Sequence, residues 1–278
     1  MSGRLRHRPR RTVLGGLCSL FDGCPTVRLS DSPEDLAHFL RVLLPGSQKR
    51  FYCRDASAAL SFDEVSAVIR LAHKYHVADI QNQGLLLLQD HYFPSDFDRY
   101  EELRKGHSLP RNLYGIAAIN LARLTNTPSL LPVAFLKCHS LREAVLDGQK
   151  RADGTVEHLS PDDLRRCFVA QSALLERNSQ AMGSVFQPKP SDTCNDPARC
   201  RRGLGDSCNL IVRKGTVFQH DFIINWAKLI ELAGQSICPE CEKELQARNA
   251  KERRKVWDDL PKIFGITVEG WSNCGAAD

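Results

Sequence analysis

The sequence predicts a mainly α-helical protein with a small β component. Apolar residues recur at three- and four-residue spacing along much of the chain, which is the spacing of one helix face. Several of these segments open with Ser-Pro or with Ser-x-x-Glu, patterns that cap the amino end of a helix. With 42% hydrophobic residues among 278, the chain can bury a substantial core.

Composition narrows the class of protein. The net charge is +5, and the 38 basic and 33 acidic residues are interspersed, so charge alone does not imply a nucleic-acid partner. No apolar run approaches the ~20 residues that span a membrane. The 11 cysteines are odd in number and scattered, which favours reduced thiols over a disulfide framework. We therefore expect a cytoplasmic or nuclear protein with no membrane partner.

The first predicted elements are a short strand and a helix. Val27-Arg28-Leu29 alternates apolar and polar residues, as a small strand does. Ser32 and Pro33 begin the helix, because a serine oxygen accepts from free amides and proline at the first helical position loses no hydrogen bond. The apolar face of this helix consists of Leu36, Phe39, Leu40 and Leu43, before Pro45-Gly46 ends it.

Two more helices follow a connector at residues 49–59. Ser61 and Glu64 predict a capping box, in which each side chain satisfies a free backbone amide. The helix they open has an apolar face of Phe62, Val65, Ile69 and Ala72, flanked by Val68, Leu71 and Tyr75. A third helix is expected from Asp79 to Phe93, closed by Pro94.

The order of these elements resembles the later half of a BTB/POZ domain. The motifs that carry the resemblance are GCPTVRLSDSPED at 23–35 and LAHKYHVADIQNQGLLLL at 71–88, and the similarity, to basidiomycete fungal BTB proteins in particular, covers residues 22–95. The resemblance implies an α/β module followed by a helical domain, and a non-enzymatic protein that binds other proteins. It also implies that the exposed parts of the helices at 36–44 and 62–75 receive the partner.

A complete domain of this type would place a strand hairpin and a further helix before Cys24. Only a fragment of that helix's usual pattern is present, in His7, Val13, Leu14, Ser19 and Phe21. The module is therefore expected to be incomplete, or the gene model shortened. Because the missing elements normally build the dimer face, both a homodimer and a monomer stay open. The family includes adaptors of cullin-type ubiquitin ligases, which makes that role an alternative function.

The other boundaries follow composition. Residues 1–21 are predicted to be a disordered basic arm, 96–111 a linker, 112–186 a helical region, 187–218 a cysteine-containing loop region and 219–271 a C-terminal helical region. The region 112–186 divides into helices at 112–125 and 129–141, a loop at 148–154 and a long helix from Ser160-Pro161 to Phe186. The face expected for the long helix is Leu164, Phe168, Gln171, Leu174, Leu175, Asn178, Ala181, Met182 and Val185.

The C-terminal region carries aromatic anchors and a Cys-x-x-Cys pair. Trp226, Trp257 and Phe264 are expected in the core of a helical domain, and the arrangement of tryptophans, cysteines and Leu-Pro around them resembles the tails of the same fungal BTB proteins. Cys238 and Cys241 have the spacing at which two thiolates grip one tetrahedral zinc ion. Cys194, Cys200 and Cys208 lie near enough in sequence to complete such a site.

Zinc is nevertheless the alternative and not the favoured interpretation of these cysteines. The upstream spacings, five and seven residues, match no standard zinc knuckle, and cysteine is also an ordinary small buried residue. We therefore predict inert thiols and assign no metal ligand, cofactor or catalytic residue. A zinc-stabilised regulator associated with nucleic acid or chromatin is the rival function.

Other patterns are weaker. His73 and His76 lie three apart on a helix but have no further ligand nearby, so a metal site is not expected. Gly203-Leu-Gly205 lacks the third glycine and the preceding strand of a dinucleotide fingerprint. The basic clusters Arg199, Arg201, Arg202 and 248–255 are predicted to be solvated helix faces, because Glu242, Glu244 and Glu252 lie before or within the second. No enzyme motif and no small-molecule substrate are evident.

Overall fold

The computed structural model describes residues 20–44, 61–105, 114–213, 223, 226–234 and 236–271. Of these, 69% are helical and 3% lie in strands, which confirms the mainly α-helical class. The chain divides into two units, Met1–Ser32 and Pro33–Asp278. The connector at 49–59 and all but the last two residues of the basic arm lie outside the described residues.

The described part of the first unit contains a β-hairpin. Strand β1, Leu20–Phe21, pairs antiparallel with β2, Cys24–Pro25. The two residues between them, Asp22 and Gly23, have φ values of 55° and 77°, which is the left-handed pair that a type I′ turn requires and that Asp-Gly supplies. The strand predicted at Val27–Leu29 is wrong, because these residues have no strand partner in the described chain, and their side chains are exposed.

Helices α1 (Pro33–Leu43), α2 (Phe62–Lys74) and α3 (Ala78–His91) lie close to their predicted positions. The capping box of α2 is confirmed, since the Glu64 amide donates to Ser61 Oγ at 3.3 Å and Ser61 N–H donates to Glu64 Oε2 at 2.9 Å. Almost the whole of α2 is buried, from Phe62 to Ala72. Helix α2 is therefore a central helix of the core, packed against both α1 and α3.

The predicted linker at 96–111 contains a helix instead. Helix α4, Phe97–Lys105, buries Phe97, Tyr100 and Leu103, and the rings of Phe97 and Tyr100 contact Trp257 at centroid distances of 5.7 and 5.1 Å. The polar residues that suggested a linker occupy the outer face of this helix or form ion pairs. Phe62 also stacks on Tyr114 at 4.2 Å, so the predicted boundary does not separate two cores.

The region that follows matches the predicted helix order. It comprises α5 (Tyr114–Leu124), the 3₁₀ turn η2 (Pro128–Leu130), α6 (Leu131–His139), the 3₁₀ turn η3 (Arg142–Leu146), a hairpin of β3 (Gln149–Lys150) with β4 (Val156–Glu157), and α7 (Pro161–Val185). Pro132 lies in the first turn of α6. Ser160 caps α7 by accepting from the Asp163 amide, as the Ser-Pro pattern predicts.

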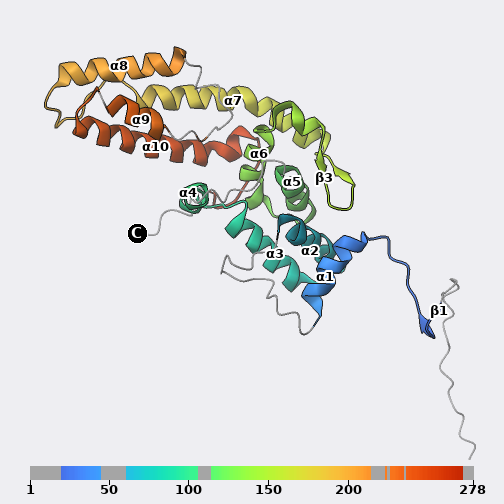
Figure 1. Cartoon of the computed structure of the whole chain (residues 1–278). Helices are drawn as coiled ribbons and strands as arrows, with labels where there is room; N and C mark the ends of the chain where they lie inside the picture. Colours follow the sequence, from blue (N-terminus) through green and yellow to red (C-terminus); the bar gives the residue numbers. More distant parts are fainter. Residues whose placement is uncertain are drawn as a thin grey trace, which may run out of the picture. The chain divides into compact units, whose positions relative to one another are not determined.

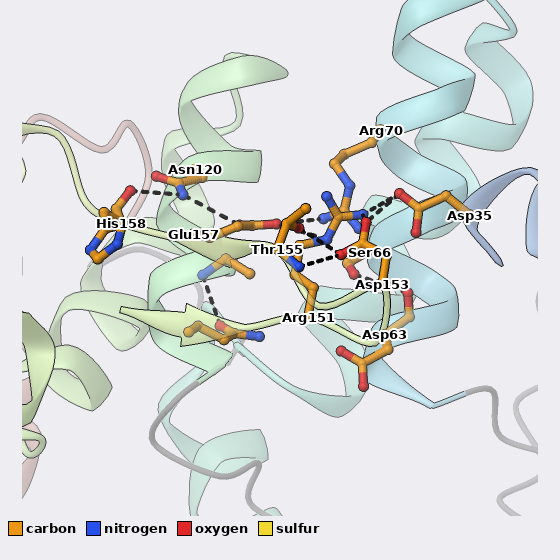
Figure 2. Close-up of polar contacts among 12 residues, drawn as sticks. Asp35, Asp63, Ser66, Arg70, Asn120, Arg151, Asp153, Thr155, Glu157 and His158 are labelled. Carbon is orange, nitrogen blue, oxygen red and sulfur yellow. Dashed lines mark hydrogen bonds and ion pairs between the residues drawn. The ribbon is translucent and has the colours of Figure 1, made fainter. Parts of the chain in front are cut away.

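The β3–β4 hairpin is tied to α1 and α2 by a half-buried charge network (Figure 2). Arg70 of α2 lies 3.4 Å from Asp35 of α1 and 3.1 Å from Glu157 of β4. Arg151, from the hairpin, pairs with the same two carboxylates and lies 3.5 Å from Asp153. Sharing two guanidinium groups among three carboxylates fixes the hairpin, because removal of either cation would leave partly desolvated anions facing each other.

Helices α7 and α10 (Pro239–Ile263), each of 25 residues, run side by side (Figure 1). Arg177 on α7 lies 2.6 Å from Asp259, and Arg166 donates to the Phe264 carbonyl at 3.1 Å, so the two helices are antiparallel. The buried face of α7 begins with Asp163, Cys167 and Ala170. The prediction that Phe168 faces inward is wrong: it is 48% exposed, because the helix turns the smaller Cys167 toward α6.

The predicted loop region at 187–218 is also partly helical. Helix α8, Pro197–Arg213, buries Cys200, Leu204 and Ile211, and α9, Ala227–Gly234, follows it. With the carboxyl end of α7 and the start of α10 these helices enclose a second hydrophobic cluster that includes Trp226. Trp257 and Phe264 belong to the first cluster, which extends from Phe39 to Trp271. All three aromatic anchors are buried, as expected.

The basic run at 248–255 is solvated only in part, since Lys251 and Lys255 are exposed but Arg253 is buried. Arg253 is only 7% exposed and forms a bidentate ion pair with Glu101 of α4. Arg254 pairs with Asp98 at 2.6 Å, and Lys255 pairs with Glu252 at 2.6 Å. Arg253 and Arg254 therefore connect α10 to α4, whereas Lys255 is paired within α10.

Replacement of Arg253 by alanine should destabilise the protein by about 3 kcal/mol, because it leaves the Glu101 carboxylate desolvated and without its cation. Urea unfolding measures the loss. The matched control is Arg165→Ala, whose ion pair with Asp162 is solvent-exposed and should contribute under about 1 kcal/mol. Equal effects of the two substitutions would contradict a structural role for the Glu101–Arg253 pair.

The Asp153 carboxylate should stabilise the protein at neutral pH and lose that effect in acid. A hydrogen bond from the Thr155 hydroxyl, at 2.6 Å, is the main cause that lowers the pKa of Asp153. A carboxyl group whose pKa is lower in the folded than in the unfolded protein stabilises the folded state at pH values above its unfolded pKa. This stabilisation is lost as the pH falls through its folded pKa. Asp153→Ala should therefore cost about 1 kcal/mol at pH 7, and the difference from the parent should narrow below about pH 4. Glu102→Ala, at an exposed side chain, is the control.

Candidate functional site

Four cysteines converge at the start of α10. Cys194 precedes α8, Cys200 lies in its first turn, Cys238 is the N-cap of α10 and Cys241 lies in the first turn of α10. Their Sγ atoms all lie within 4.8 Å of one another, and those of Cys194 and Cys238 are 3.7 Å apart. Cys200 and Cys241 are buried, and Cys194 and Cys238 are half-buried.

Backbone amides point at the sulfur atoms. The Cys238 N–H donates to Cys200 Sγ at 3.2 Å, and the Ser191 N–H donates to Cys241 Sγ at 3.3 Å. Two features of the chain make this possible. Gly203 lets α8 approach the segment before Cys238, since a Cβ there would lie 3.0 Å from Ser236 O and Ile237 Cγ2. Pro239 begins α10 immediately after Cys238, which presents the free amides of the helix start to the cluster.

The thiols of the cluster differ in acidity. The pKa of Cys238 is lowered to about 7, mainly by the backbone N–H of Cys241. Burial raises the pKa of Cys241 to about 12 and also raises that of Cys200. Without a cation, a thiolate is therefore favoured at Cys238 over Cys200 or Cys241. A bound cation would reverse this balance and deprotonate its ligands.

The sequence analysis identified five cysteines as possible members of a metal site and could not tell which of them come together. The structure brings together Cys194, Cys200, Cys238 and Cys241 and leaves Cys208 outside, packed against the second hydrophobic cluster. The sequence indicates part of this cluster through the Cys-x-x-Cys pair at a helix start. It does not indicate that α8 forms, and Cys200 comes close to Cys238 only because α8 lies beside α10.

The weaker candidates have structural roles. His76, at φ 58°, occupies the left-handed position after α2, with the Val77 amide bonded to the Ala72 carbonyl as in a Schellman cap. His73 interacts with Gln81 at 3.2 Å. Gly203 and Gly205 lie inside α8, so no phosphate-binding loop forms there. Arg199, Arg201 and Arg202 are exposed on α8, as expected.

A surface pocket of about 380 Å³ lies between α6, η3 and α7. Phe168, Leu146, His139, Arg142 and Glu143 are among its lining residues. Cys138 and Cys167 also line it, but burial raises the pKa of Cys167 to about 12 and raises that of Cys138 well above its ordinary value. Neither thiol is activated as a nucleophile, because that requires the thiolate.

Comparison with protein-family models, with curated proteins and with solved structures finds no match for this chain. Within the described residues, no helix combines the length and apolar character needed to cross a bilayer.

Alkylation should separate the thiols by environment. At pH 8, iodoacetamide should modify the exposed Cys24 at least about 10-fold faster than Cys138 or Cys167, because these two are buried and their pKa values are raised. Mass spectrometry of the tryptic peptides reports each site. Rapid modification of Cys167 in the folded protein would instead identify an activated thiol in the pocket.

Proposed function

We propose that this chain is an intracellular, non-catalytic protein-interaction module of the BTB/POZ type, whose ligand is another protein chain. The proposal combines the sequence resemblance over residues 22–95 with one feature of α1. Binding would come from burial of apolar surface between chains, with no bond chemistry.

The observation that carries the proposal is an exposed apolar face on α1. Leu40, Leu43 and Leu44 are 42%, 41% and 60% exposed. Their spacing puts them on one side of the helix. Tyr75 extends this surface, because it stacks on Phe39 at 6.0 Å and is itself 38% exposed. We call Leu40, Leu43, Leu44 and Tyr75 the α1 face. Clustered exposed apolar side chains are typical of protein-binding sites.

The α1 face is narrower than the surface expected from the sequence. Within the expected range 62–75, the apolar residues Phe62, Val65, Ile69 and Ala72 are buried among α1, α3 and α5. The exposed apolar part of this range is Tyr75. The margin of the α1 face is basic. Arg41 is exposed, and Lys74 lies 5.5 Å from the Tyr75 ring. A partner with an apolar centre and acidic margin would complement these residues.

Substitution of Leu40, Leu43 and Leu44 by serine should weaken binding of a protein partner to the α1 face. The chain should stay folded, because all three side chains are already exposed. The control carries serine at Leu86, Leu124 and Leu210, which are 51%, 45% and 40% exposed elsewhere. Two measurements apply: light-scattering mass across a concentration series for self-association, and quantitative co-purification of partners with the tagged full chain.

We expect at least about a 10-fold loss of association in the α1 variant and little change in the control, since a few central apolar residues carry most of an interface's energy. Urea unfolding of both variants checks that the fold is intact. Retention of every partner and of the same mass by the α1 variant would refute the role of this face.

A further inference from the structure

We propose that Cys194, Cys200, Cys238 and Cys241 bind one zinc ion through four thiolates, and that this ion holds α8 to the start of α10. The inference does not depend on the proposed interaction function. It concerns the second hydrophobic cluster, whereas the α1 face belongs to a helix packed on the first.

The geometry favours a tetrahedral ion. Zinc–sulfur bonds of about 2.3 Å place the corners of an S₄ tetrahedron about 3.8 Å apart. The 3.7 Å separation of the Cys194 and Cys238 sulfur atoms matches this edge, and all remaining separations are at most 4.8 Å. A contraction of an ångström or less therefore completes the site, with no rearrangement of the helices.

The surroundings of the sulfur atoms support anionic ligands. The Cys238 and Ser191 amides donate to Cys200 Sγ and Cys241 Sγ. Hydrogen bonds of this kind orient the ligands of a metal site and tune it. The cluster also lies at the positive end of α10, a 25-residue helix, which stabilises negative charge at Cys238 and Cys241. Each coordinating thiol releases its proton as it binds zinc.

Other occupants of the site are less well matched. A disulfide needs sulfur atoms about 2.05 Å apart, so two disulfides would distort the arrangement in which all four sulfurs are mutual neighbours. Tetrahedral S₄ sites also take iron. Divalent zinc binds more tightly than ferrous iron to the same ligands, and its filled d shell imposes no further geometry. Zinc is therefore the ion to which we assign the site.

The ion would supply cohesion that α8 otherwise lacks. Within α8 the buried residues are Cys200, Gly203, Leu204 and Ile211, so two small residues make up half of its inner face. The loop from Ser191 to Asp196 is fixed to α10 through the Cys241 sulfur atom. Coordination would join this loop, α8 and α10 at one point. Loss of zinc should loosen α8 and leave the first hydrophobic cluster folded.

The test begins with the full chain purified under reducing conditions. Elemental mass spectrometry should find one zinc per chain, and competition with a chromophoric chelator should give its affinity. Cys194→Ser and Cys238→Ser should weaken zinc binding by more than about 100-fold; both side chains are half-buried, so serine should not prevent folding. Cys208→Ser is the matched control and should bind zinc as the parent does.

Limited trypsin digestion gives an independent readout. The exposed Arg199, Arg201 and Arg202 provide cleavage sites on α8, and Arg165 on α7 is the internal reference. After chelation, cleavage on α8 should increase at least about 10-fold relative to cleavage at Arg165, and added zinc should reverse the change.

Three results would overturn the proposal. A folded chain that takes up no zinc when Zn²⁺ is added under reducing conditions has no such site. Stoichiometric iron would assign the site to another metal. Fewer than the 11 free thiols of the sequence, counted after denaturation without reductant, would indicate disulfides in the cluster if the missing thiols map to these cysteines.

Discussion

The structure from Pro33 onward depends on the antiparallel packing of α7 against α10. The amino half of α7 and the carboxyl half of α10 contribute Cys167, Leu174, Trp257 and Leu260 to the first hydrophobic cluster, and their opposite halves contribute to the second. Neither helix is apolar along its whole surface, so each needs the other to bury its inner face. The pair therefore forms a common frame to which α1–α6 are attached at one end and α8 and α9 at the other.

Local sequence patterns predicted most of the helices. The features that were not predicted depend on packing between residues far apart in the sequence. Caps such as Ser61 with Glu64, and Ser160 with Pro161, act within four residues and can be recognised without knowing the fold. Helix α4 was missed because its polar residues outnumber its apolar ones, and its Phe97 and Tyr100 find their partner, Trp257, more than 150 residues later. Phe168 was assigned inward because periodicity cannot tell which of two adjacent positions faces the neighbouring helix.

The cysteine cluster shows the same division between local and long-range information. Cys238 and Cys241 are three residues apart and could be paired from the sequence. Cys194 and Cys200 could be assigned to the cluster only once α8 was known, because Gly203 of α8 permits the close approach to Ser236 that brings them there. Gly203, Gly205 and the Asp206-Ser207 pair weaken the helical signal of α8, so the region resembled a loop. The five residues between Cys194 and Cys200 match no standard zinc knuckle. The two sulfur atoms still meet, because helix α8 and not the sequence spacing places Cys200 at the site.

The two hydrophobic clusters also separate the two functions proposed for this chain. The α1 face belongs to a helix packed against α2 in the first cluster, whereas the four sulfur atoms lie at the second. Helix α10 takes part in both clusters, and its contacts Arg253–Glu101 and Trp257–Trp271 lie well beyond the turn that carries Cys238 and Cys241. Because these contacts do not involve the cysteines, a chain without metal can keep its first cluster and its α1 face, with disorder confined to α8 and the residues joined to it.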